Sequence, residues 1–244
     1  MIVQTEFIDL PAEATPMRTM VAKPAQPGTY PGLLLFSDIF GLTESMQRAI
    51  IRFASHGFVV AAPEIYHRIE PAGHAFDFTS DYKAALTAAT RLHAKELDAD
   101  TRVVLDFLAT SPAARGKSLH ATGFCIGGHL AFRAALEPKV RSSVAFYPTG
   151  LHAAALGGDS NVDTLARCEE IRGSILVVFG ATDPHIPVDG RRAVDDALRA
   201  AKVRYLISEY DGEHAFMRDI GPRYDAAETD RAMAQAVGFL RQYE

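Results

Sequence analysis

Short apolar runs alternate with segments of helical spacing along most of the chain. The continuous apolar run at 33–36 is typical of a buried parallel strand, and 45–55 carries apolar residues at helical spacing before Gly57. The same reasoning predicts further strands at 58–62, 118–123, 140–147, 173–180 and 204–210. It predicts further helical segments at 77–109, with a break near 98–100, and at 127–136, 162–171, 189–202 and 225–243.

This alternation indicates an α/β protein. Two extended segments at 2–10 and 17–24 are predicted to pair as a leading hairpin. Strands interleaved with helices require crossover connections, so we expect a mostly parallel central sheet covered by helices on both faces. A length of 244 residues is compatible with one such domain, and we predict a single domain over 1–244. Ligands bind at the carboxyl ends of the strands in sheets of this kind, so residues at strand ends carry the most information.

Composition narrows the classes of function. A net charge of −5 argues against nucleic-acid binding. The chain contains no run of about 18 apolar residues, the length that would be needed to span a membrane. The N-terminal sequence MIVQTEFIDL has no basic region before an apolar stretch, so we expect no signal peptide and a cytoplasmic protein. The two cysteines, Cys125 and Cys168, are too few for a disulfide framework and are expected to be free thiols.

The segment GFCIGG at 123–128 matches the small-x-nucleophile-x-small pattern between an apolar strand and a helix. Such a turn holds its central residue in a strained conformation, and side chains at Gly123 or Gly127 would collide with neighbouring backbone. Cys125 is therefore the predicted nucleophile, at a helix amino end that favours a thiolate. Taken alone, the segment is also compatible with a tight turn around a buried structural cysteine.

Two other predicted strands end next to residues that complete a catalytic set. The apolar run VVFG is followed by Asp183 in a turn, and the strand at 204–210 is followed by a loop that carries His214. Singly, such an aspartate is usually a turn former and most histidines are surface or core residues. The order nucleophile, acid, histidine is similar to that of the α/β-hydrolases. We therefore predict an α/β-hydrolase fold with a triad of Cys125, His214 and Asp183.

Five segments of the chain together resemble the dienelactone hydrolase family, the cysteine-nucleophile branch of the α/β-hydrolases. They are SDIFGL, APEIYHR, GFCIGG, GATDPHIP and YDGEHAFMR. The resemblance implies acyl transfer through a thiol ester, with Cys125 as nucleophile, His214 as base and later acid, and Asp183 holding the imidazole. It implies a small ester or lactone as substrate, and neither a metal nor a cofactor.

The resemblance also implies roles for residues around the triad. The family pattern has a glutamate that contacts the resting thiol, and here the position is occupied by Asp38, which is one methylene shorter. By analogy, the backbone N–H groups of Ile39 and Ile126 form the oxyanion hole. Arg218 corresponds to the family arginine that holds a substrate carboxylate.

Two further substrate-binding residues are predicted less directly. The second carboxylate-binding arginine of the family belongs before the long helix, where this chain offers Lys83 and Arg91, and neither aligns securely. Tyr147 ends a predicted strand beside the nucleophile turn, where it either lines the pocket or fills the core.

Three functions remain open at this point. We expect a hydrolase that cleaves a small ester or lactone, as a monomer or homodimer with no nucleic-acid or membrane partner. The alternatives are a carboxylesterase or thioesterase of broad specificity that acts on neutral acyl compounds, and a hydrolase-fold ligand sensor that keeps the thiol without turnover.

Overall fold

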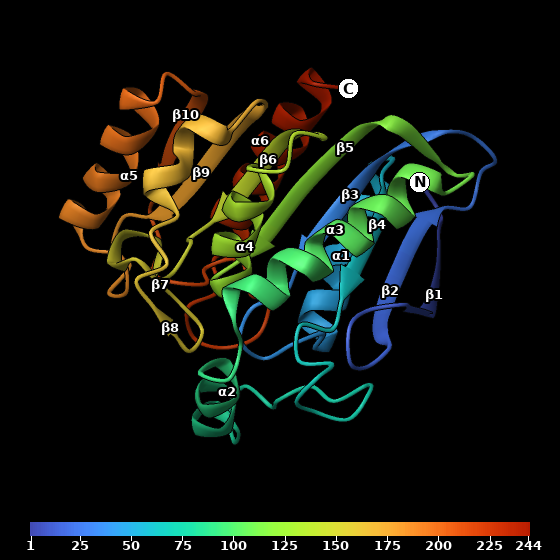
Figure 1. Cartoon of the computed structure of the whole chain (residues 1–244), viewed down its shortest axis with the longest axis horizontal. Helices are drawn as coiled ribbons and strands as arrows, with labels where there is room; N and C mark the ends of the chain where they lie inside the picture. The colour runs from blue at the N-terminus through green and yellow to red at the C-terminus, as the bar shows by residue number, and fades with distance from the viewer.

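An eight-stranded sheet with the order β1-β2-β4-β3-β5-β6-β9-β10 runs through the molecule (Figure 1). The computed structural model describes the backbone of residues 1–244 and every side chain except those of 115–117. The strands of this sheet are β1 (Val3–Leu10), β2 (Met17–Pro24), β3 (Tyr30–Phe36), β4 (Val59–Pro63), β5 (Ala114–Phe124), β6 (Val140–Phe146), β9 (Ser174–Gly180) and β10 (Arg204–Tyr210). Two short strands, β7 (Ala155–Leu156) and β8 (Asp159–Ser160), pair separately.

The sheet is antiparallel at one edge and parallel elsewhere. β1 and β2 form the predicted hairpin, and β2 also pairs antiparallel with β4. From β4 to β10 all neighbouring strands are parallel. The predicted fold class is therefore confirmed: this is an α/β-hydrolase fold with a mostly parallel central sheet.

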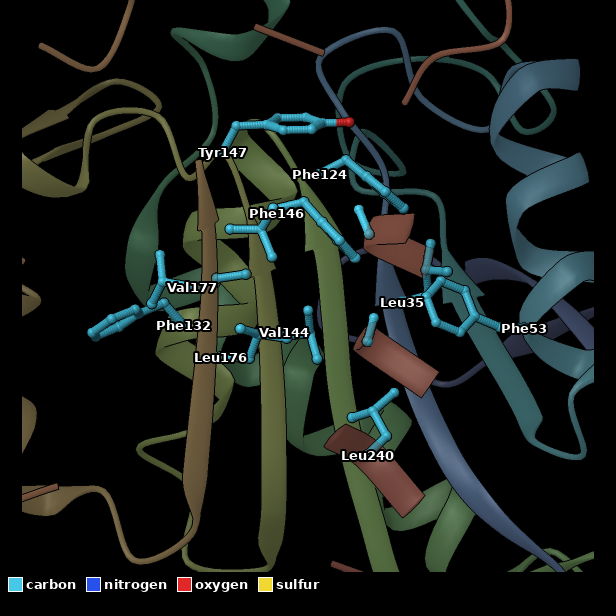
Figure 2. Packing of buried hydrophobic residues seen from close by; sticks show 14 of the residues in the cluster. Leu35, Phe53, Phe124, Phe132, Val144, Phe146, Tyr147, Leu176, Val177 and Leu240 are labelled. Atoms are coloured by element: carbon cyan, nitrogen blue, oxygen red, sulfur yellow. The ribbon is translucent and has the colours of Figure 1, made fainter. Parts of the chain in front are cut away.

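Helices cover both faces of the sheet because its central strands are apolar on both sides. In β3, Leu33 and Leu35 pack in one cluster with residues of α1 and α6, while Leu34 and Phe36 pack in another with α3. Figure 2 shows the first cluster from close by. The helices are α1 (Glu44–Ser55), α2 (Tyr82–Ala89), α3 (Ala94–Thr110), α4 (Ile126–Ala134), α5 (Val188–Ala200) and α6 (Ala226–Gln242). None of the described helices combines the length and apolarity needed to cross a bilayer.

Two predicted helical segments differ from the structure. The break expected near 98–100 lies instead at 90–93, between α2 and α3, and α3 continues through 98–100. Asp98 and Asp100 project from the helix into ion pairs with Arg133 and Arg68. The segment 162–171 forms only a short 3₁₀ helix, η2 (Leu165–Glu170). In both segments the contacts of the folded protein, and not the local pattern of apolar residues, decide the secondary structure.

The carboxyl ends of the parallel strands point toward the part of the molecule where α2 stands apart from the sheet (Figure 1). The loops after β3, β5, β6, β9 and β10 all begin at this edge. They carry Asp38, Cys125, Tyr147, Asp183 and His214. The fold therefore gathers the predicted site residues at one end of the sheet.

Two histidines inside the fold predict a loss of stability in mild acid. His120 and His129 are fully buried, and burial lowers their pKa to about 4 and about 3. Unfolding exposes both to water, where an imidazole binds a proton below about pH 6.5. The unfolded state thus binds more protons, and the free energy of unfolding should fall as pH decreases from about 6.5 to about 4.

Urea titrations at several pH values measure this decrease. His120→Asn removes one titrating group and should make the slope shallower by up to about 1.4 kcal/mol per pH unit. An unchanged slope in this variant would show that His120 is not neutral in the folded protein.

Candidate active site

Cys125 occupies a sharp turn between β5 and α4. Its backbone has φ 61° and ψ −120°, a conformation that side chains rarely adopt. A Cβ atom on Gly123 would lie 2.1 Å from the Gly127 carbonyl oxygen, and one on Gly127 would lie 2.2 Å from the Ser37 carbonyl oxygen. The two glycines therefore let the turn close against the end of β3, and the turn holds Cys125 at the sheet edge.

The acid and histidine loops are bonded directly to each other. The Ala181 N–H donates to the Tyr210 carbonyl at 2.8 Å, and the Thr182 N–H donates to the Gly212 carbonyl at 3.1 Å. A Cβ atom on Gly180 would lie 2.5 Å from the same Gly212 oxygen, so only glycine permits this approach. The strand pairing of β9 with β10 thus continues into the loops and fixes their relative position.

His214 and Asp183 meet at the ends of these loops. His214 Nδ1 lies 2.7 Å from Asp183 Oδ2, and both residues are buried. The other carboxylate oxygen, Oδ1, accepts the His185 N–H at 2.8 Å. Asp183 therefore has both oxygens engaged, one of them on the imidazole.

The electrostatic environment favours a charged pair. Burial opposes a charge on His214, but the Cys125 charge and hydrogen bonds to Asp183 and Cys125 outweigh it and raise the His214 pKa to about 9. Burial also opposes ionisation of Asp183, yet its hydrogen bond to His214 and the charge there lower the pKa of this carboxyl. An imidazolium between a carboxylate and the sulfur is the arrangement that keeps a thiol reactive.

A threonine hydroxyl also contacts the sulfur. Thr149 Oγ1 lies 3.6 Å from Cys125 Sγ, and the Thr149 N–H donates to the Cys125 carbonyl at 3.2 Å. Thr149 follows β6, the strand beside β5, so its backbone is held against the nucleophile turn.

A pocket of about 670 Å³ opens above these residues. Cys125, Thr149 and His214 lie in its wall, and α2 contributes Tyr82 and Leu86. The remaining lining residues are Ile39, Phe40, Phe78, Gly150, His152, Ala153, His185, Arg218, Pro222 and Arg223. A volume of this size suits a small molecule, and the wall is largely apolar with a few polar groups.

Asp38 lies near this pocket but bonds to Arg218. Its Oδ2 accepts from Arg218 Nε at 3.1 Å and from Nη2 at 2.8 Å, while Oδ1 accepts the Phe40 N–H at 3.0 Å. The Arg218 guanidinium also lies over the rings of Phe40 and Phe78, at 4.8 and 4.6 Å from their centroids. The charge of Arg218 is therefore largely compensated within the protein.

Comparisons with known proteins point to the same family as the five motifs. The model of the dienelactone hydrolase family matches residues 17–244. A candidate carboxymethylenebutenolidase of Saccharomyces cerevisiae is 32% identical, with 98% of this chain and 90% of the relative covered. The chain belongs to the dienelactone hydrolase family. It is therefore an enzyme of the carboxylic ester hydrolase class, as predicted.

Other relatives extend the same picture. A candidate carboxymethylenebutenolidase of Escherichia coli K12 is 30% identical, with 97% of this chain and 86% of the relative covered. The crystal structure of a candidate dienelactone hydrolase of Klebsiella pneumoniae superposes with a TM-score of 0.88 at 23% identity, and both chains are fully covered. At that identity the superposition shows the shared fold.

Of the two residues predicted to form the oxyanion hole, Ile126 follows Cys125 in the chain and Ile39 lines the same pocket as Cys125. Ile126 is the first residue of α4, so its N–H has no carbonyl one turn earlier in the helix. Ile39 lines the pocket, and the Tyr66 hydroxyl donates to the Ile39 carbonyl at 2.8 Å, which fixes this peptide. Burial raises the pKa of Tyr66, so the hydroxyl stays protonated as a donor.

Asp38 and Lys83 do not take the positions that the resemblance implies, whereas Tyr147 takes the core position, one of the two alternatives that the sequence left open for it. The hydrogen bonds of the described side chains join the Cys125 sulfur to Thr149 and not to Asp38, because both Asp38 oxygens have other partners. Tyr147 is buried with its ring 5.1 Å from the His214 ring, and Figure 2 shows it within the first core cluster. Lys83 is exposed on α2 and lies outside the pocket lining, since Tyr82 and Leu86 occupy the face turned to the pocket.

Several pocket residues escape sequence reasoning. Thr149 lies two residues beyond Tyr147, and the rule that strand ends carry ligand sites could have identified it. His185 lies in a loop and His152 in the short 3₁₀ helix Leu151–Ala153, and the tertiary structure decides that both reach the pocket. Within the described part of the chain no group of three or more His, Cys, Asp or Glu side chains is arranged to hold a metal ion.

Proposed function

We propose that the protein hydrolyses a small ester or lactone through a thiol-ester acyl-enzyme, with Cys125 as nucleophile, His214 as base and acid, and Asp183 orienting the imidazole. The observation that carries this proposal is the contact of His214 with Asp183, 2.7 Å between Nδ1 and Oδ2, in a pocket whose wall also carries Cys125, the charge of which raises the His214 pKa. The names of the relatives, which refer to carboxymethylenebutenolidase, support a lactone as the natural substrate.

The first half of the proposed reaction acylates the enzyme. The Cys125 thiolate attacks the carbonyl carbon, and the electron pair of the C=O bond moves to the oxygen, which the N–H groups of Ile39 and Ile126 stabilise. When the oxyanion collapses, the C–O bond of the ester breaks, and the His214 imidazolium protonates the leaving oxygen. In a lactone this oxygen stays attached to the acyl group as the ring opens.

The second half releases the product. His214, now neutral, takes a proton from a water molecule while the water oxygen attacks the thiol-ester carbon. Collapse of that intermediate breaks the C–S bond and gives a carboxylic acid and the thiolate, beside a His214 that is protonated again. Asp183 keeps the imidazole in the tautomer that both halves need.

A second candidate function is the hydrolysis of neutral esters. It is favoured by Arg218, whose charge is already matched by Asp38 and by two aromatic rings. A substrate carboxylate would have to compete with Asp38 for this guanidinium. Apolar side chains such as Phe78 and Leu86 offer contacts to a neutral acyl or alkoxy group instead.

A substrate screen with an Arg218 variant separates the two candidates. We expect wild-type turnover of cis- or trans-dienelactone, and Arg218→Gln should raise KM for these anions about tenfold while KM for p-nitrophenyl acetate changes less than about twofold. Arg223→Gln is the matched control, because Arg223 also lines the pocket but pairs with Glu213.

Each other outcome has a clear meaning. Equal KM changes for both substrates in Arg218→Gln would favour neutral esters. A wild-type protein that binds lactones but turns over neither class would contradict the proposed hydrolysis and favour a ligand sensor.

A further inference from the structure

The hydroxyl of Thr149 is a polar group at the nucleophile that the proposed reaction has not used. We propose that Thr149 Oγ1 donates a hydrogen bond to the Cys125 thiolate and thereby positions and stabilises the attacking sulfur. The inference rests on the proposed function only for its effect on turnover. The contact itself, 3.6 Å between Oγ1 and Sγ, stands on geometry.

The direction of this bond follows from the charge of the sulfur. A thiolate has no hydrogen, so a hydroxyl in contact with it can act only as the donor. His214 lines the same pocket, and the Cys125 charge raises the His214 pKa, so an imidazolium provides the opposite charge. The hydroxyl and the imidazolium together favour the thiolate, and the hydroxyl fixes its direction toward the pocket.

The backbone of Thr149 is held rigidly enough for this role. Its N–H donates to the Cys125 carbonyl at 3.2 Å, and its carbonyl lies 3.1 Å from His129 Nδ1. A carbonyl can only accept, so His129 carries its hydrogen on Nδ1. Burial lowers the His129 pKa to about 3, so the ring is neutral and Nε2 is an acceptor.

The rest of the network agrees with this tautomer. Thr164 Oγ1 lies 2.8 Å from His129 Nε2 and accepts from Arg133 Nη1 at 2.9 Å, so the Thr164 hydroxyl donates to the imidazole. Arg133 is itself paired with Asp98. A series of hydrogen bonds thus runs from Arg133 through Thr164 and His129 to the Thr149 carbonyl. The Thr149 hydroxyl takes no part in this series and contacts the sulfur.

Thr149 makes a contact with the sulfur that the family pattern assigns to an acid. In this chain the corresponding residue, Asp38, is turned to Arg218 and the Phe40 N–H. A hydroxyl differs from a carboxylate in that it carries no charge, so it stabilises the thiolate and does not repel it. The described titratable and charged groups that face the site from the surrounding elements are Asp38, Tyr66, Tyr82, Tyr147, His152, Asp183, His185, His214, Arg218 and Arg223.

The test measures the rate of iodoacetamide alkylation of Cys125 between pH 4 and 10. Thr149→Val keeps the volume of the side chain but removes the donor. We expect the pH at which alkylation is half maximal to rise by about 0.5 to 1 unit, the size expected for the loss of one ordinary hydrogen bond. Turnover of p-nitrophenyl acetate at neutral pH should fall about three- to tenfold in parallel.

Two control variants distinguish this role from a structural one. Thr149→Ser restores the hydroxyl and should restore the wild-type midpoint. Thr101→Val removes another buried threonine hydroxyl, which donates to the Leu97 carbonyl within α3 outside the pocket lining, and should leave the midpoint unchanged. The slower labelling of Cys168, whose thiol pKa burial raises to about 11, is separated by mass spectrometry of the peptides.

The outcomes separate the two proposals. A Thr149→Val midpoint equal to that of the wild type would overturn the role of the hydroxyl, as would a shift of equal size in Thr101→Val. A shifted midpoint in a protein that shows no esterase activity would support the contact and contradict the proposed hydrolysis.

Discussion

Cys125→Ala is expected to lower the turnover of p-nitrophenyl acetate by at least about a thousandfold. The variant removes the sulfur that contacts Thr149 and leaves the turn intact, since alanine fits wherever cysteine does. What remains are the pocket and the backbone N–H groups, which bind the ester but cannot form an acyl-enzyme. Initial rates measured against the uncatalysed reaction give the size of the loss.

Cys125→Ser provides the chemical control. A hydroxyl is far less acidic than a thiol, so a site that keeps a thiolate beside an imidazolium should deprotonate serine poorly and lose most of its activity. Cys168→Ala should leave turnover unchanged, because Cys168 is buried in η2. Activity of Cys125→Ala well above background would rule out the proposed nucleophile.

Asp183→Asn is expected to reduce kcat by about two to four orders of magnitude. One oxygen of Asp183 must accept the His185 N–H, and an asparagine can do so only with its carbonyl. Its NH₂ group then faces His214 Nδ1, where the aspartate oxygen lies at 2.7 Å in the wild type. The imidazole must accept at Nδ1 and carry its hydrogen on Nε2. A neutral imidazole in that tautomer cannot take a proton through the nitrogen nearest the sulfur.

A pH–rate profile identifies this mechanism. Because the Asp183 charge also helps to raise the His214 pKa, the imidazolium in Asp183→Asn should lose its proton at lower pH than in the wild type. Asp211→Asn is a suitable control, since Asp211 is exposed on the same loop. Equal losses in the two variants would mean that Asp183 acts only through general folding of the loop.

The sequence determined the scaffold and the identity of the proposed triad. Apolar runs of strand length were sufficient to predict the central strands, because strands buried on both faces are apolar throughout. The turn at GFCIGG could be predicted from its glycines, because a Cβ atom at Gly123 or Gly127 would overlap backbone atoms and the local geometry permits no other residue there. Asp183 and His214 were identified by their positions after strands.

The tertiary structure decided which partners the remaining side chains take. Asp38 and Arg218 are 180 residues apart, and only the arrangement of the loops after β3 and β10 pairs them with each other. Lys83 lies outside the pocket lining because Tyr82 and Leu86 occupy the face of α2 that is turned to the pocket. Thr149 contacts the sulfur because β6 lies beside β5 in the sheet order. Strand-end patterns are local properties of the chain, whereas these contacts depend on distances between segments far apart in sequence, which the pattern of residues does not contain.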